Sequence, residues 1–278
     1  MAFLEITPLL HAGIGGRLNN IGGQTDLALL YHMGLGVPKD DAEACRWWRK
    51  AAEQGSTGSQ VNLGTAYHLG VGVSKDDAEA VRWWQKAADK GEPVAQLNLG
   101  LAYQHGEGVE KDPAKGTEWL RKAAEQGNAG AQNWLAVAYE SGTGVGADHE
   151  AAVRWFRKAA EQGVAPAQYS LGTHLYFGDG VTKDYVEAAR WWQKAAEQGI
   201  AWAQYNLGTA YHIGSGVEKS DVEAYFWVNL AATSIEQKVV RETRDIIAKS
   251  LTPAQLAEVQ ERCRKWAEAH HPTPQPLR

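Results

Sequence analysis

Glycine pairs of the form Gly-x-Gly are the residues that most invite a chemical interpretation. They recur six times, from Gly34-Leu35-Gly36 to Gly214-Ser215-Gly216. A glycine-rich loop can hold a phosphate when it joins a strand to a helix within a strand-helix-strand unit. No such context surrounds these loops in the sequence. A repeated turn, in which glycine adopts a positive φ that other residues resist, explains them better than six nucleotide sites.

Other reactive side chains lack the spacing of a catalytic or metal site. Cys45 and Cys263 lie in or beside apolar helical stripes, with no histidine at nucleophile or ligand spacing, so we interpret them as packing residues. His270-His271 offers too few fixed ligands for a metal. The Lys-Asp pairs suit helix capping and solvation rather than catalysis; they are Lys39-Asp40, Lys75-Asp76, Lys111-Asp112 and Lys183-Asp184. We expect no catalytic residue, no metal and no cofactor.

Composition narrows the class of protein. The 278 residues are 44% hydrophobic and 22% charged, as in globular proteins, and the net charge of −5 argues against a nucleic-acid partner. No stretch approaches the roughly 20 apolar residues of a membrane-spanning helix, so we expect no membrane insertion. Two unrelated cysteines favour a reducing compartment, and residues 1–20 do not resemble a signal peptide. We expect a cytoplasmic protein, or a periplasmic or secreted one if an N-terminal signal was removed.

Tryptophan recurs at a fixed interval of 36 residues, at Trp47, Trp83, Trp119, Trp155, Trp191 and Trp227. A period of this length is typical of a helix-loop-helix unit that can bury its apolar face only against a neighbouring copy. We expect these rings to pack in the core, and the replacement of Trp119 by alanine to cost several kcal/mol. Six units follow from the period: 21–56, 57–92, 93–128, 129–164, 165–200 and 201–236.

Two helical periodicities fill the unit 57–92. Polar and apolar residues from Gln60 to Tyr67 have the spacing of one helix face, which predicts helix A over 58–69, and those from Ala80 to Ala87 predict helix B. Asp76 or Asp77 can cap helix B, and Gly91 suits the left-handed position after it. Small residues in one helix A column, namely Gly64, Gly100, Gly172 and Gly208, and paired alanines in helix B are expected to receive the large rings.

These residues resemble the Sel-one-like repeat (SLR) family, relatives of the tetratricopeptide repeats. The matching pattern is Ala-x-Ala-Gln-x-x-Leu-Gly-x-x-Tyr-x-x-Gly-x-Gly-Val-x-Lys-Asp, followed by Glu-Ala-x-x-Trp-x-x-Lys-Ala-Ala-Glu-Gln-Gly, and 93–128 and 201–236 carry much of it. The resemblance implies an all-α, right-handed superhelical solenoid and a bacterial source. The fourth unit departs at Ala136 and Ala147, and the fifth has Leu175 where tyrosine is usual. These departures concern local packing and leave the array intact.

The period is lost after the sixth unit. Residues 237–271 are expected to form two capping helices, 239–248 and 253–269, the second begun by Thr252 and Pro253. Leu256, Val259, Cys263 and Trp266 can share one face of it and cover the apolar end of the last repeat. We expect residues 1–20 to be an N-terminal flank and the proline-rich 272–278 to be a disordered tail.

A variable stripe on the A helices lies beside the core stripe, and the resemblance implies that it lines a concave groove. Aromatic and polar side chains together are typical of a surface that docks a peptide or protein segment. The alternative is that these residues only coat the inner curve or pack between units. The candidate partner-binding residues are His32, His68, Leu97, Leu101, Gln104, Asn133, Glu140, Tyr169, Tyr176, Trp202, Tyr205 and His212.

Three functions remain open on the sequence. The first, which we favour, is a non-catalytic protein-protein interaction scaffold, such as a bacterial regulatory or adaptor protein. The second is a protein that binds cell-wall fragments or binds or hydrolyses β-lactams, as the resemblance to cysteine-rich secreted relatives implies, although this chain lacks their cysteine pairs and any Ser/Lys or Cys/His constellation. The third is a secreted factor that engages a host protein.

Overall fold

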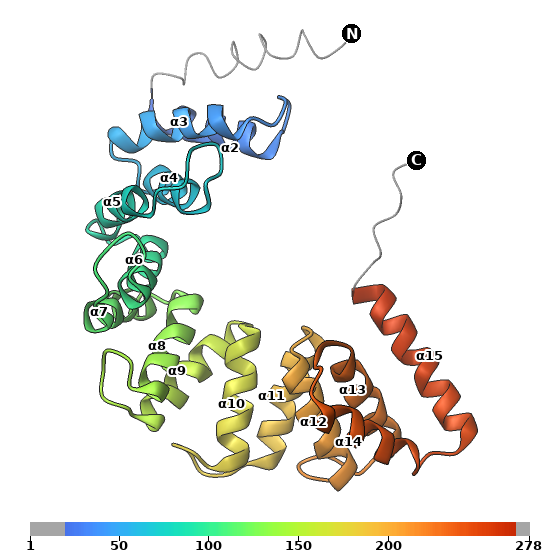
Figure 1. Ribbon diagram of the computed structural model, residues 1–278. Helices are drawn as coiled ribbons and strands as arrows, with labels where there is room; N and C mark the ends of the chain where they lie inside the picture. The colour runs from blue at the N-terminus through green and yellow to red at the C-terminus, as the bar shows by residue number, and fades with distance from the viewer. Residues whose placement is uncertain (1–19, 271–278) are drawn as a thin grey trace, which may run out of the picture. The chain divides into compact units, whose positions relative to one another are not determined.

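The computed structural model describes residues 20–270, and every regular element in that range is an α-helix (Figure 1). The all-α prediction is therefore confirmed for this part of the chain. Apart from Asn20, the flank 1–20 and the tail 272–278 lie outside the described residues. None of the described helices combines the length and the apolar character that crossing a membrane requires.

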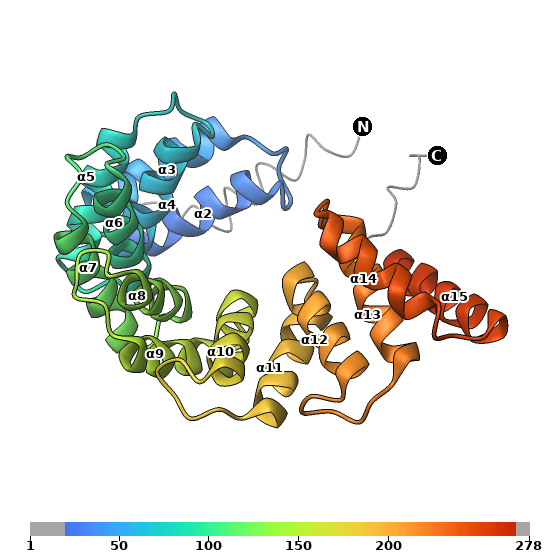
Figure 2. The ribbon, with the colours of Figure 1, turned by 60° about the horizontal axis from the view of Figure 1, so that its bottom comes forward.

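The helices fall into two compact units, divided between Ala147 and Asp148. The first unit contains α2 (Ile21–Met33), α3 (Asp41–Glu53), α4 (Thr57–Leu69), α5 (Asp77–Ala88), α6 (Pro93–His105), α7 (Pro113–Glu125) and α8 (Ala129–Ser141). The second contains α9 (His149–Glu161), α10 (Ala165–Phe177), α11 (Tyr185–Glu197), α12 (Ala201–Ile213), α13 (Asp221–Ser234), α14 (Lys238–Ala248) and α15 (Pro253–His270). Consecutive helices such as α10 and α11, or α12 and α13, lie side by side in both views (Figures 1 and 2).

Local sequence sets the ends of these helices. Ser56 accepts a hydrogen bond from the backbone of Ser59 at the start of α4, and Gly70 ends that helix with a φ of 70°. Of the two candidate caps of α5, the structure uses Asp76, whose Oδ1 accepts from the Glu79 amide at 3.0 Å. Gly91 has the expected left-handed conformation, with a φ of 88°. Both helices of this repeat therefore follow from their capping residues.

The Gly-x-Gly loops join each repeat to the one before it. The second glycine, Gly72, has a φ of 70°, and a Cβ on it would lie 2.1 Å from the carbonyl oxygen of Asp41 at the start of α3. Gly216 meets Tyr185 at the start of α11 in the same way, with 1.9 Å to its carbonyl oxygen. Only glycine can occupy such a position, because any side chain would overlap the backbone. The loops are thus structural turns.

Helices A and B approach each other through the glycine column, as expected, but the ring involved is not the periodic tryptophan. A Cβ on Gly64 would lie 2.6 Å from both Cδ1 and Nε1 of Trp84, and one on Gly172 would lie 2.7 Å from Cδ1 of Trp192. These rings follow the periodic tryptophans by one residue. This second column faces the helix A glycines at Trp84, Leu120, Trp192 and Val228. All six of its residues are buried: Trp48, Trp84, Leu120, Phe156, Trp192 and Val228.

The periodic tryptophans pack between repeats, and several of them are only half-buried. Trp83 is buried against the preceding repeat, whereas Trp47, Trp119 and Trp155 keep part of their surface exposed. A lysine ammonium covers most of these rings; the Nζ of Lys122 lies 4.0 Å from the centre of the Trp119 ring. Trp119 packs against the core cluster of α5 and α6, as expected, but it is only half-buried, and a cation rather than a helix covers its solvent side.

A column of buried glutamines closes each junction between repeats. Gln168 donates from Nε2 to the carbonyl of Ala160 near the end of α9, at 3.1 Å, and its Oε1 accepts from Nε2 of Gln198 at 2.8 Å. Gln60 and Gln204 make the equivalent bond to Ala52 and Ala196. The Ala-x-Ala-Gln pattern therefore places an amide where it can satisfy a carbonyl at the end of the previous helix.

The two helices after the sixth repeat cover its apolar end. Val259 and Cys263 of α15 are buried in one cluster with Val240 and Ile247 of α14 and the core of α13. Thr252 accepts from the Gln255 amide, while the Gln255 side chain accepts from the Thr252 amide at 3.0 Å, which is a capping box. The predicted start of this helix and its apolar face are confirmed.

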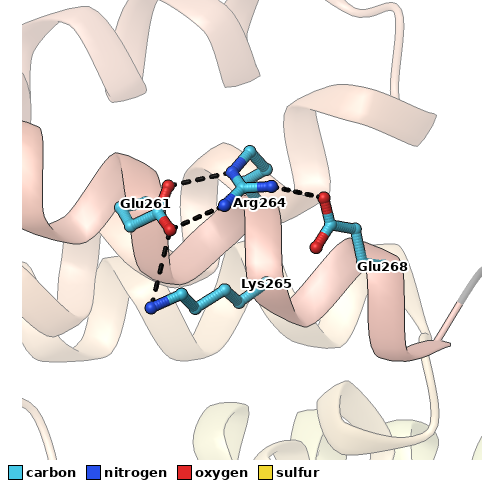
Figure 3. Close-up of polar contacts among 4 residues, drawn as sticks. All are labelled: Glu261, Arg264, Lys265 and Glu268. Atoms are coloured by element: carbon cyan, nitrogen blue, oxygen red, sulfur yellow. Dashed lines mark hydrogen bonds and ion pairs between the residues drawn. The ribbon is translucent and has the colours of Figure 1, made fainter.

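The opposite face of α15 is charged (Figure 3). Arg264 donates to both carboxylate oxygens of Glu261, at 2.9 and 2.7 Å, and to Glu268 one turn further on. The hydrogen bond from Arg264 lowers the pKa of Glu261 to about 2. These neighbours at i+3 and i+4 suit a solvated helix surface.

Candidate binding surface on the A helices

The twelve candidate residues are divided between the two units. His32, His68, Leu97, Leu101, Gln104, Asn133 and Glu140 belong to the first unit, and Tyr169, Tyr176, Trp202, Tyr205 and His212 to the second.

The three candidate histidines are engaged within their own repeats. His68 Nδ1 lies 2.7 Å from Oδ1 of Asp77 at the start of the following helix, and its ring packs against Trp84 at 5.6 Å between centres. Burial raises the pKa of Asp77, but hydrogen bonds from His68 and Lys75 outweigh this and hold it below its ordinary value. His32 pairs with Asp41 and His212 with Asp221, both at 2.6 Å. These imidazoles fix helix A to helix B, and their outer edges stay partly exposed.

The other candidates of the first unit differ in exposure. Gln104 is buried and its Nε2 lies 3.5 Å from Oγ1 of Thr117, so it is a packing residue rather than a surface one. Leu97, Leu101 and Asn133 are half-buried, and Glu140 is exposed. Among the candidates of this unit, His32 lines a cavity. This cavity has about 160 Å³ and is also lined by Leu29, Trp48, Asn62, Thr65 and Leu69.

The second unit brings four of its five candidates together. Tyr169, Tyr176, Trp202 and Tyr205 line one open cavity of about 300 Å³ between α10, α11 and α12. The remaining wall consists of Thr173, Phe177, Trp192, Asn206, Thr209 and Ala210. The i, i+3 and i+7 spacing along two neighbouring A helices thus produces a real concavity here. We name it the aromatic cavity.

Ring contacts hold the walls of the aromatic cavity in place. Tyr176 packs against Trp192 at 5.1 Å between ring centres, and Trp202 meets Tyr205 edge to face at 5.9 Å. Trp202 is nevertheless 37% exposed and Phe177 63% exposed. Exposed aromatic carbon next to tyrosine and threonine hydroxyls and an asparagine amide suits the recognition of large apolar side chains with polar backbone beside them.

The cavity wall includes residues that were not among the sequence candidates, Phe177, Trp192 and Asn206 among them. Phe177 is the last residue of α10, and the same position in other repeats holds exposed apolar residues, namely Met33, Leu69 and Ile213. An apolar residue stands directly before the capping glycine in four of the six repeats although it is exposed there, and this recurrence was the available signal. Trp192 both faces Gly172 between the paired helices and lines the cavity.

Both cysteines are free thiols buried among helices. Cys45 is buried, which raises the pKa of its thiol to about 11, and Cys263 is buried with a raised pKa as well. A thiol with a raised pKa is protonated and unreactive at neutral pH. The packing role expected for both residues agrees with these surroundings.

Comparison with known proteins gives the family context. The family model described as Sel1 repeat matches residues 22–56, 58–92, 93–128, 129–164, 165–200 and 203–234. A Sel1 repeat protein from Oxalobacter formigenes is 33% identical, with a TM-score of 0.69 over 77% of this chain and 86% of that one. A protective antigen of uropathogenic Escherichia coli with an SLR fold is 31% identical over 95% of this chain and 74% of that one, at a TM-score of 0.44. An immunity protein from Pseudomonas aeruginosa is 22% identical over 90% and 89%, at a TM-score of 0.46. No curated protein matches the sequence.

Proposed function

This chain belongs to the Sel1 repeat family, and we propose that it binds a segment of a partner protein in the aromatic cavity of its second unit without catalysing a reaction. Sel1 repeat proteins are generally protein-protein interaction scaffolds and generally non-catalytic. The observation that carries the proposal is the convergence of Tyr169, Tyr176, Trp202 and Tyr205 on one open cavity.

The size of the aromatic cavity indicates what it holds. About 300 Å³ accommodates one or two large side chains of a peptide, not a folded domain. The partner segment would place a leucine, phenylalanine or similar residue against Trp202 and Tyr205, while the hydroxyl of Thr209 and the amide of Asn206 lie beside its backbone. Buried aromatic rings at the centre of a contact contribute most of the binding energy in such interfaces.

Two tryptophans of equal exposure provide the test. Trp202 in the cavity and Trp134 on α8 are each 37% exposed, and Trp134 does not line the aromatic cavity. Partners are captured from a lysate of the source organism with the wild-type chain and identified by mass spectrometry. The affinity of the purified partner is then measured for the wild type, Trp202→Ala, Tyr205→Ala and Trp134→Ala.

We expect Trp202→Ala and Tyr205→Ala each to weaken binding by roughly 10-fold or more, as for interface hot spots. Trp134→Ala should leave the affinity within about twofold. Circular dichroism establishes that each variant keeps its helices. Equal affinity of all four proteins for every captured partner would disprove the role of the cavity, and loss of binding only in Trp134→Ala would move the site to the first unit.

A further inference from the structure

We propose that His149, His174 and Asp179 form a binding site for a divalent transition-metal ion, with zinc as the expected ion. One donor atom from each residue lies within 4.8 Å of the other two, and within residues 20–270 this is the one group of three or more such side chains. His149 is the first residue of α9, His174 lies in the last turn of α10, and Asp179 lies in the loop between α10 and α11.

The distances suit a tetrahedral ion. Oδ2 of Asp179 lies 2.9 Å from Nδ1 of His149 and 3.6 Å from Nδ1 of His174. Zinc bonds of about 2.0–2.1 Å at tetrahedral angles place neighbouring ligand atoms about 3.3–3.4 Å apart. The two observed distances lie on either side of that value. An ion would replace the hydrogen bonds of this cluster, including the one of 2.9 Å between His174 Nδ1 and the Asp179 carbonyl.

His149, His174 and Asp179 each differ from the residues at the equivalent positions of the other repeats. The cluster is therefore distinct from the His-Asp pairs found elsewhere in the chain. The column of His149 holds aspartate in three of the other repeats, at Asp41, Asp77 and Asp221. The column of His174 holds alanine or leucine in every other repeat, and that of Asp179 has no other aspartate. Three other repeats bring one imidazole and one carboxylate together, whereas this junction combines two imidazoles with a carboxylate.

The surroundings hold the ligands in place and leave a route for the ion. His174 is 4% exposed and its ring packs against Phe156 at 5.7 Å between centres. The loop carrying Asp179 is fixed by Gly180, on which a Cβ would lie 2.4 Å from the backbone carbonyl of His149. The side chains of His149 and Asp179 remain 44% and 51% exposed. Two imidazoles and one carboxylate leave a fourth position for water, as at open zinc sites.

The test uses the full chain, free of any histidine tag and stripped with a chelator. Co²⁺ is titrated while the visible absorption that reports tetrahedral coordination is followed, and Zn²⁺ is then added to displace it. We expect one equivalent to bind, Zn²⁺ to displace it, and His149→Asn and Asp179→Asn each to weaken affinity by at least about 10-fold. Both replaced side chains are partly exposed, so these variants should fold.

Two controls make the result specific to the cluster. His212→Ala removes an imidazole that pairs with Asp221 in the same unit but has no part in the cluster, and it should bind Co²⁺ as the wild type does. His270→Ala with His271→Ala should likewise leave binding unchanged. The proposal is overturned if the wild type binds no stoichiometric Co²⁺, if both cluster variants keep full affinity, or if replacing the two C-terminal histidines abolishes binding.

Discussion

Gly64→Ala is expected to destabilise the first unit even though alanine forms helices better than glycine. A Cβ at this position would lie 2.6 Å from two atoms of Trp84 and 3.1 Å from the carbonyl oxygen of Ala80. Trp84 is 5% exposed, so its ring cannot move aside, and the carbonyl belongs to a helix backbone. Overpacking of this kind costs about 1–3 kcal/mol, against a helix-propensity gain of about 1 kcal/mol. The net loss of stability should therefore lie between zero and about 2 kcal/mol.

Gly58 in the same helix provides the matched control. Apart from its chain neighbours and the backbone of its own helix, no atom would lie within 4 Å of a Cβ on Gly58. Gly58→Ala should therefore raise stability, by up to about 1 kcal/mol. Urea unfolding followed by circular dichroism gives the midpoint and slope for each protein, and a constant slope shows that the midpoints report stability. If Gly64→Ala proved as stable as Gly58→Ala, the close approach of helices A and B would not limit the size of the side chain at position 64.

The fourth repeat suggests a compensating change. Its sequence has Ala136 in the glycine column and the smaller Phe156 in the column of Trp84, whereas the first repeat combines Ala28 with Trp48. Introducing Trp84→Phe beside Gly64→Ala should therefore reduce the cost of the alanine, since a smaller ring leaves room for the methyl group. A double-mutant cycle measures this coupling, and additive effects would contradict it.

Three further outcomes follow from single contacts. Gln168→Leu should lower the free energy of unfolding by about 1–2 kcal/mol, because the buried hydrogen bond from the glutamine amide to the Ala160 carbonyl is lost. Unchanged urea unfolding would contradict this. Trp119→Ala should cost less than Trp84→Ala, which should cost about 3–5 kcal/mol in the same assay. A hydrogen bond from Arg157 lowers the pKa of Glu187 in the folded protein. The ionised carboxylate therefore stabilises the fold fully above its unfolded pKa of about 4.3, and this contribution is lost as the pH falls through the lower pKa of the folded state. The stability lost in Glu187→Gln should thus shrink between about pH 6 and about pH 3, and a constant difference would refute the assignment.

Periodicity was enough to predict the helices, because each repeat presents the same apolar face and the same capping residues. It could not decide which of two adjacent tryptophans lies between paired helices. Trp83 and Trp84 both suit a buried helix face, and only the position of Gly64 in space selects Trp84. The half-exposed state of Trp119 was equally hidden, because the lysine that covers its ring looks in sequence like an ordinary surface charge.

The candidate site was predicted unevenly for a related reason. The aromatic residues of α10 and α12 converge as their spacing implied, since neighbouring A helices are stacked with their faces aligned. The histidines were taken for surface groups because their aspartate partners lie nine residues further on, across a loop. His149 lies in one repeat and His174 and Asp179 lie in the next, so no local sequence motif predicts this cluster.

The contact between the second glycine of each Gly-x-Gly loop and the backbone of the preceding repeat constrains how the length of such a chain can change. Gly72 contacts the backbone of Asp41, and Gly216 contacts the backbone of Tyr185. Because these contacts use main-chain atoms, they do not depend on the other side chains of the two repeats. A repeat of 36 residues could therefore be duplicated or deleted without changing the contacts at its two ends. The insertion of a single residue in the loop would instead move the glycine away from the backbone carbonyl that it contacts. Such a chain would grow or shrink by whole modules, while its exposed side chains diversified independently.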